Sequence, residues 1–131
     1  MSANKPLLVD SDILIDVLRK HAPARDYLRS IQNPLLISAM TSVELWAGAK
    51  GRQQEEILEE LLAGFDLVEV TIAVARRASE ISYQFSKSHG TGAVDAVIAA
   101  STEMEGATLV TLNKKHYPML AKGKVLVPYK K

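Results

Sequence analysis

The sequence predicts a three-layer α/β/α fold with a central, mainly parallel sheet. Short apolar runs alternate with amphipathic segments along the 131 residues, which is the pattern of strands connected by helices. The segment 93–104 is small and apolar nearly all round, and such a helix is normally buried between layers. A chain of this length fits one domain, so we expect residues 1–131 to fold as a single unit.

The first predicted strand is the apolar run 6–9, which stops abruptly at the carboxylate of Asp10. Apolar residues then recur with helical spacing over 13–18, so a helix is expected directly after a tight corner. A second short helix begins near Pro23, a residue suited to the first turn, and the pair 33–34 ends it. This part of the chain therefore predicts a strand followed by two helices.

The remaining predicted strands are short apolar runs at 35–37, 65–70, 108–111 and 125–127. Besides the helix at 93–104, three helices are expected between them: one from about 41 to 48, an amphipathic one over 55–63, and a long one that Thr71 caps and Gly90 interrupts. A turn or short helix is expected at 113–117. Because strands and helices alternate, the strands should lie parallel.

Composition excludes several classes of protein. The chain has no cysteine, which rules out disulfides, thiolate catalysis and cysteine-bound zinc. Its formal net charge is only +1, so any polyanion must bind to a local basic patch. No signal peptide or long apolar run is visible in the sequence. We therefore expect a cytoplasmic protein that does not associate with membranes.

Asp95 is the most informative acidic residue. It is the only charged residue between His89 and Glu103, within a helix of alanine, valine and isoleucine. A buried carboxylate is costly unless it is paired or bound to a metal. The alternative is a first-turn acid that the helix dipole favours, and this explanation is equally compatible with the sequence around Asp95.

Three further polar residues follow predicted strands or begin helices. Asp10 ends the first strand, and could instead cap the helix that follows. Glu44 lies three residues after Thr41, which is the spacing of a capping box, and spacing alone favours that structural role. Asn113 follows the strand at 108–111, where a plain turn residue is the usual explanation.

Taken together, these residues predict a metal site. Asp10, Glu44 and Asp95 lie at helix starts that one edge of a parallel α/β sheet would bring together. Clustered carboxylates repel, so a hard dication such as Mg²⁺ is their natural partner. The chemistry that fits is hydrolysis of a phosphodiester, in which the metal activates water and neutralises charge on the phosphate.

The same residues resemble a known family. The matching segments are 8–16, 41–45 with Gly48, 95–100 and 109–117, and their order and spacing resemble PIN-domain ribonucleases. The size of the chain and the coverage of nearly its whole length look like the VapC toxins of bacterial type II toxin–antitoxin systems. The resemblance implies an endoribonuclease that depends on Mg²⁺ or Mn²⁺ and cleaves RNA, often transfer or ribosomal RNA. It also implies neutralisation by a VapB-type antitoxin and a homodimer.

By this resemblance Asp10, Glu44 and Asp95 form the acidic triad that binds the metal. Asn113 occupies a position often filled by a fourth acid, and it can ligate or orient a water without adding negative charge. We therefore expect one well-occupied Mg²⁺ instead of two. Thr111 is expected to support the site through its hydroxyl, whereas Asp12 and Asp16 are expected to be a helix-start charge and a surface charge.

Other side chains have simpler explanations. Basic residues flanking the acidic edge could hold RNA phosphates, although most basic residues here are expected to be solvated. The candidates for phosphate contact are Arg19, Lys50, Arg52, Lys114 and Lys115. Trp46 is expected in the core or at an interface, and His89 and His116 are expected to be solvated surface residues too isolated to form a histidine metal site.

Two alternative functions remain open from the sequence. A signalling domain of receiver type also has acids after its first strand, but Asp66 begins its predicted strand where such a domain needs an aspartate at the end. A catalytically silent PIN-type module that only binds RNA or protein is the second, and Asn113 is the feature in its favour. Dinucleotide binding is not expected, because no glycine-rich fingerprint follows a strand.

Overall fold

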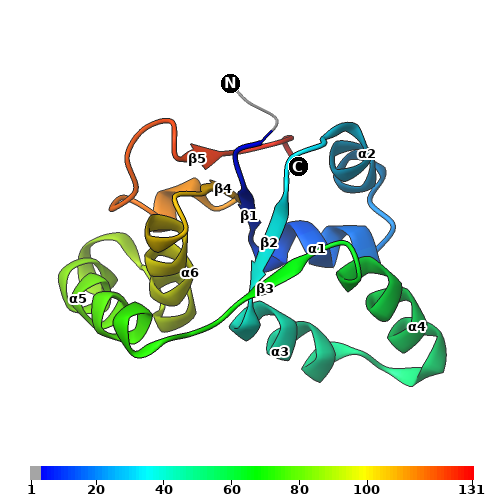
Figure 1. The fold of residues 1–131 in the computed structure, drawn as a ribbon, viewed down its shortest axis with the longest axis horizontal. Helices are drawn as coiled ribbons and strands as arrows, with labels where there is room; N and C mark the ends of the chain where they lie inside the picture. The colour runs from blue at the N-terminus through cyan, green and yellow to red at the C-terminus, as the bar shows by residue number, and fades with distance from the viewer. Residues whose placement is uncertain (1–3) are drawn as a thin grey trace.

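A parallel sheet forms the centre of the protein (Figure 1). The computed structural model describes residues 4–131. The strands are β1 (Leu7–Val9), β2 (Leu35–Ser38), β3 (Asp66–Val68), β4 (Thr108–Val110) and β5 (Val125–Leu126). Their order in the sheet is β3-β2-β1-β4-β5, and each pair of neighbours runs parallel. The predicted parallel sheet is confirmed, although the strand expected at 65–70 is shorter.

Helices cover both faces of this sheet (Figure 1). One side carries α1 (Ser11–Leu18), α2 (Ala22–Ser30), α3 (Ala39–Gly48) and α4 (Gly51–Leu62), and the other carries α5 (Ile72–His89) and α6 (Ala93–Met104). A short 3₁₀ helix, η1 (Lys114–His116), follows β4. The three predicted layers are thus confirmed. None of the helices in the described part of the chain has the length and apolar character needed to cross a membrane.

The core is divided by the sheet into two clusters. Leu8 of β1 packs with Ile81 and Ile98 on the face covered by α5 and α6. Leu7 and Val9 point the other way, toward α1 and α4. Successive residues of a strand face opposite sides, so β1 is buried on both faces. This explains why its sequence is a continuous apolar run.

The strand order reverses beside β1. β2 and β3 follow β1 on one side, whereas β4 and β5 lie on the other. In open α/β sheets, ligands bind outside the carboxyl ends of the strands where the order reverses. Asp10 directly follows β1 and Thr111 directly follows β4, so both residues lie at this position.

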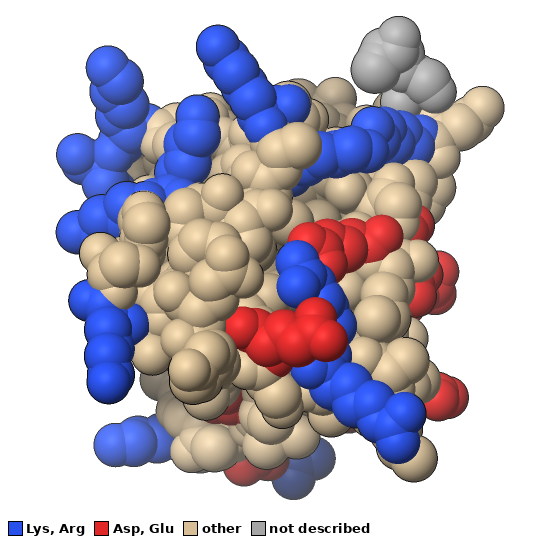
Figure 2. All heavy atoms as spheres, turned by 90° about the vertical axis from the view of Figure 1, so that its left-hand side faces the viewer, with Lys and Arg blue, Asp and Glu red and all other residues tan. Residues whose placement is uncertain are grey.

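Helices α5 and α6 pack side by side, and α6 lies nearer to the sheet than α5 (Figure 1). Arg77 of α5 pairs with Glu103 of α6, with 2.8 Å between Nε and Oε1. Seen from this side, basic side chains lie mainly around the margin and much of the surface between them is uncharged (Figure 2). Exposed ion pairs contribute only about 0–1 kcal/mol, so apolar contacts account for most of the packing of these helices.

Asp16 is buried, and the prediction of a surface charge is wrong. The residue is 2% exposed. Its Oδ2 accepts a hydrogen bond from the Tyr129 hydroxyl at 2.8 Å, and its Oδ1 accepts one from Lys131 Nζ at 2.6 Å. Burial alone would raise the pKa of Asp16, but the Lys131 ammonium and the Tyr129 hydroxyl outweigh burial and lower it. The last residues of the chain are therefore tied to α1.

Replacing Asp16 with asparagine should lower the free energy of unfolding at pH 7 by about 1–3 kcal/mol, because hydrogen bonds to a buried charge are lost. The folded pKa is lowered, so this contribution is present above the ordinary aspartate pKa of 3.8 and disappears as the pH falls through the lowered value. Urea unfolding should therefore separate wild type and variant at pH 7 and show them converging in acid.

A suitable control is Asp26→Asn, which removes an exposed pair with Arg25. This variant should change the free energy of unfolding by less than about 0.5 kcal/mol. An equal loss for Asp16→Asn at neutral and acid pH would show that the charge of Asp16 contributes nothing.

Candidate functional site

Asp10 lies where β1 ends and α1 begins. It is the N-cap of α1, with an extended backbone, and is only 7% exposed. Its Oδ1 accepts a hydrogen bond from the backbone N–H of Ser11 at 2.9 Å. The capping role considered from the sequence is therefore correct. The second oxygen of the carboxylate points to other partners.

Two hydroxyl groups donate to that second oxygen. Asp10 Oδ2 accepts from Thr111 Oγ1 at 2.9 Å and from the Tyr117 hydroxyl at 2.8 Å. Burial raises the pKa of Asp10, the hydrogen bonds act in the opposite direction, and the charge of Asp95 raises it further. The hydroxyl support expected from Thr111 is confirmed. A buried acid beside a second acid favours a nearby cation, which would stabilise the ionised form.

Asp95 has the first-turn role considered from the sequence, and its side chain is 26% exposed instead of fully buried. Its Oδ2 accepts from the backbone N–H of Gly92 at 3.1 Å, which caps the first turn of α6. Its Oδ1 lies 3.2 Å from the Tyr117 hydroxyl, the same group that donates to Asp10. His116 is not a fully solvated residue, since its Nδ1 lies 3.4 Å from Asp95 Oδ2. Asp10 and Asp95 thus converge on one hydroxyl group.

Glu44 does not form the predicted capping box. Helix α3 begins at Ala39, because the Ser38 hydroxyl accepts from the Met40 N–H at 3.1 Å and serves as N-cap. Thr41 is consequently inside the helix and Glu44 lies in its second turn. Burial raises the pKa of Glu44, and repulsion by Asp10 and Asp95 raises it further. Glu44 is exposed, yet close enough to experience both charges.

Asp12 belongs to this cluster, although the sequence predicted only a helix-start charge. Its Oδ2 accepts from the Leu112 backbone N–H at 2.9 Å and from the Asn113 side-chain amide at 3.1 Å. Burial and then repulsion by Asp10 raise the pKa of Asp12 to about 6. Asn113 therefore orients Asp12 through its amide nitrogen. Its amide oxygen accepts no hydrogen bond from the described residues.

Tyr117 is the residue of the site that sequence reasoning missed. It is 2% exposed, and its hydroxyl contacts both Asp10 and Asp95. Burial is the main cause that raises its pKa, and the two carboxylates raise it further, so the phenol stays protonated. A tyrosine after a turn carries no local signal for this role, because its partners lie 107 and 22 residues away.

The donor chemistry of the cluster suits a hard divalent cation. Asp10, Asp95 and Glu44 all offer carboxylate oxygens, and Mg²⁺ is often held by one or two carboxylates plus waters and substrate phosphates. Within residues 4–131, no group of three or more histidine, aspartate or glutamate side chains is arranged so that it could hold a metal ion by itself. A cation bound by these carboxylates would therefore need water or substrate oxygens as further ligands.

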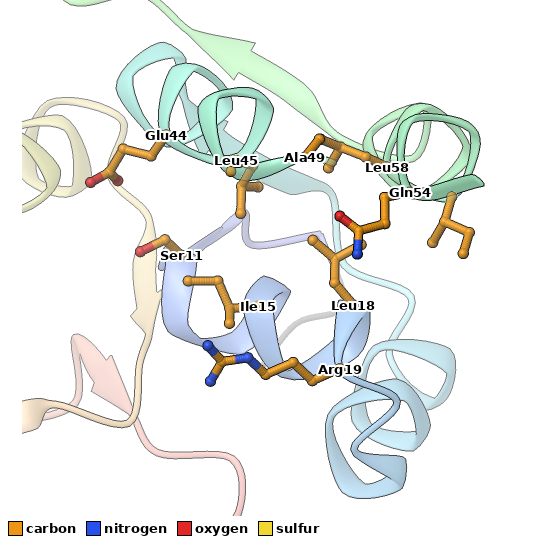
Figure 3. A pocket seen from close by; sticks show the side chains of 11 residues that line it. Ser11, Ile15, Leu18, Arg19, Glu44, Leu45, Ala49, Gln54 and Leu58 are labelled. Atoms are coloured by element: carbon orange, nitrogen blue, oxygen red, sulfur yellow. The ribbon is translucent and has the colours of Figure 1, made fainter. Parts of the chain in front are cut away.

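A groove leads away from the acidic cluster between α1, α3 and α4 (Figure 3). Its volume is about 340 Å³. Ile15, Leu18 and Leu45 give it an apolar lining, and Glu44 lies at one end beside Ser11. The groove therefore offers an apolar surface that ends at an acid of the site.

Sequence comparisons identify relatives along most of the chain. The family model of the PIN domain matches residues 7–119. Ribonuclease VapC10 of Mycobacterium tuberculosis is 39% identical over 116 residues, covering 86% of this chain and 86% of the relative. Ribonuclease VapC19 of the same organism is 30% identical over 116 residues, covering 86% of this chain and 92% of the relative.

Solved structures show the same fold. The chain in a toxin–antitoxin complex from Klebsiella pneumoniae superposes with a TM-score of 0.81 at 26% identity, covering 95% of this chain and 99% of that one. A chain of VapBC2 from Rickettsia felis, bound to a promoter DNA fragment, has a TM-score of 0.75 at 24% identity, covering 88% and 95%. The match to the family model spans most of the sequence, and this chain belongs to the PIN-domain family.

Proposed function

We propose that the protein is a metal-dependent endoribonuclease of the VapC type that acts in the cytoplasm. The observation that carries the proposal is the convergence of Asp10 and Asp95 on the Tyr117 hydroxyl, with Glu44 close enough to be repelled by both. PIN-domain ribonucleases generally use divalent metal ions, and the relatives reported above are named ribonucleases. The proposed substrate is RNA, with transfer or ribosomal RNA as the target class.

Asp10, Asp95 and Glu44 are the proposed ligands of Mg²⁺, for which Mn²⁺ can substitute. The chemistry that such a cation supplies in hydrolases is a more acidic coordinated water and neutralisation of charge on the phosphate. Asn113 adds an amide oxygen without negative charge, so we propose one well-held cation. Its hydrogen bond to Asp12 places this amide at the rim of the cluster.

Basic side chains near the cluster are the proposed contacts for RNA phosphates. Lys114 and Lys115 of η1 are exposed and directly follow Asn113. Arg19 lines the groove that Glu44 borders (Figure 3). Lys50 and Arg52 lie at the start of α4, and Arg52 pairs with Glu56 on an exposed surface that RNA phosphates could reach. Such contacts position RNA without reading its sequence.

Replacing Asp95 with asparagine tests the proposed function. The amide oxygen of asparagine can still accept the Gly92 N–H that caps α6, so the fold should persist while the charge is lost. Cleavage of a fluorescently labelled RNA in Mg²⁺ should fall by about 100-fold or more, since a charged metal ligand is removed. EDTA should abolish the wild-type activity.

The matched control is Asp66→Asn, an exposed acid at the start of β3. It should cleave RNA at the wild-type rate. Full activity of Asp95→Asn would refute the proposed site. If the wild type binds RNA but does not cleave it in Mg²⁺ or Mn²⁺, the catalytically silent module is favoured. The presence of Asn113, where a fourth acid is often found, is compatible with that alternative.

A VapB-type antitoxin is the proposed protein partner, and the groove between α1, α3 and α4 is its proposed binding surface. The solved structures that resemble this chain include toxin–antitoxin complexes. The groove pairs an apolar lining with access to Glu44. An antitoxin segment with apolar residues on one side could fill it and block the acidic cluster at the same time.

Replacing Leu18 with lysine should weaken antitoxin binding by about 10-fold or more, because a charge is placed in the apolar groove. Calorimetric titration with the protein encoded beside this gene provides the measurement. Met104→Lys is the control, since Met104 is exposed at the end of α6, outside the groove. Unchanged affinity for Leu18→Lys would place the partner elsewhere.

We also propose a homodimer formed through an exposed apolar patch. The side chains proposed to form it are the exposed apolar residues Val43, Trp46, Leu67, Val70 and Ile72. The patch residues come from α3, from β3 and the residues after it, and from the start of α5, and α3 contacts β3 in the fold. The core position considered for Trp46 is wrong, because its side chain is exposed. β3 is an edge strand, so a second copy would cover both the apolar side chains and the unpaired edge of β3.

Sedimentation velocity should show a dimer for the wild type and a monomer for Trp46→Asp, because the substitution places a charge within the patch. Tyr83→Asp is the control, since Tyr83 is exposed on α5 outside the patch. A wild-type protein that sediments as a monomer at every concentration would refute the proposed dimer.

A further inference from the structure

The hydroxyl of Tyr117 makes more contacts than its burial requires. A buried phenol has one hydrogen and needs one acceptor. Tyr117 has two charged acceptors, Asp10 Oδ2 at 2.8 Å and Asp95 Oδ1 at 3.2 Å. These carboxylates belong to different elements, the β1–α1 junction and α6. A purely structural phenol would have no need to lie between them.

The backbone around Tyr117 holds the phenol in this place. The Tyr117 N–H donates to the Lys114 carbonyl at 3.0 Å and closes η1. The Thr91 hydroxyl donates to the His116 carbonyl at 2.8 Å, which ties this turn to the loop before α6. The ring itself packs in the core cluster shared with α5 and α6. The position of the hydroxyl is therefore set by the same elements that carry Asp95.

No other side chain in the described part of the chain bonds to both acids. The remaining donors to Asp10 are Ser11 and Thr111, which lie beside it at the ends of β1 and β4. The remaining contacts of Asp95 are with Gly92, in its own helix cap, and with His116, whose Nδ1 lies 3.4 Å from Oδ2. The carboxylates of Asp10 and Asp95 repel each other because both approach the same hydroxyl. Without Tyr117, none of these hydrogen bonds would link the two acids and fix the distance between them.

We propose that Tyr117 is a positioning residue whose hydroxyl holds Asp10 and Asp95 at the spacing that receives a divalent cation. This inference rests on the proposed function, because it assigns both acids to one cation. Tyr117 acts on the carboxylates and not on RNA. Partners that orient metal ligands in this way commonly change metal affinity when they are removed.

Replacing Tyr117 with phenylalanine removes only the hydroxyl and keeps the buried ring. The affinity for Mn²⁺, measured by calorimetry on the protein without RNA, should fall by about 10-fold or more. The Mn²⁺ concentration that gives half-maximal RNA cleavage should rise by the same factor, whereas the rate at saturating Mn²⁺ should remain near the wild-type value. A 4-aminophenylalanine at this position, which retains a donor, should restore the affinity.

Tyr129→Phe is a closely matched control. It also removes a phenol that donates to a buried aspartate at 2.8 Å, but its partner is Asp16. This variant should lose stability and keep the wild-type affinity for Mn²⁺. Circular dichroism and thermal melting of each variant verify that it folds, and the 4-aminophenylalanine variant tests the same contact should the phenylalanine variant fold poorly.

The outcomes separate this inference from the proposed function. Equal Mn²⁺ affinity in wild type and Tyr117→Phe, or tighter binding by the variant, would overturn the positioning role, even if the wild type cleaves RNA. If Tyr117→Phe binds Mn²⁺ more weakly than the wild type but the wild type cleaves no RNA, the positioning role is supported and the nuclease function is refuted. A wild type that binds no Mn²⁺ would overturn the positioning role outright.

Discussion

The burial of the Asp10 carboxylate at the junction of β1, β4 and α1 is the constraint on which the site depends. A charged carboxylate removed from water is costly unless other groups replace its hydration. Three donors do so here: the Ser11 backbone and the hydroxyls of Thr111 and Tyr117. They come from two parts of the chain, the residue after Asp10 and the segment that follows β4. Asp10 can therefore be accommodated only when the sheet order and the segment after β4 are both in place.

Helix α1 is joined to the rest of the molecule by acidic side chains near both of its ends. Asp12 receives hydrogen bonds from Leu112 and Asn113, which follow β4. Asp16, one turn later, receives them from Tyr129 and Lys131. These contacts connect the first helix to residues about a hundred positions away. They make the position of Asp10 a property of the whole fold, which suits a group that must hold a ligand in a fixed geometry.

Several negatively charged side chains lie together at the carboxyl-terminal edge of the sheet, and their hydrogen bonds compensate only part of the repulsion between them. Burial and neighbouring acids raise the pKa of Asp10, of Asp12 and of Glu44. Such a cluster is unfavourable for stability alone and becomes favourable when a cation is present. The chain belongs to the PIN-domain family, and in the proposed function this acidic cluster is where RNA is cleaved. Glu44 also borders the groove, so a partner protein lying there would cover part of the proposed site.

The α/β class, the helix at 93–104 and the proximity of Asp10 to Asp95 followed from the sequence. Periodicity reports which residues are buried, and a lone charge in an apolar helix is visible without coordinates. Local spacing misled the interpretation at Glu44, because Ser38 caps α3 in place of Thr41. Helix caps compete over a few residues, and the end of β2 decides which one is used.

Only the tertiary structure decided the roles of Asp12, Asp16 and Tyr117. Their partners lie between 22 and 115 residues away, and a contact at that separation leaves no periodic trace in the sequence. By itself, therefore, the sequence determined which layers form and which acids lie at the ends of strands and the starts of helices, since both depend on local burial patterns. The three-dimensional fold decided how those acids are held, since that depends on which distant segments the sheet order brings beside β1.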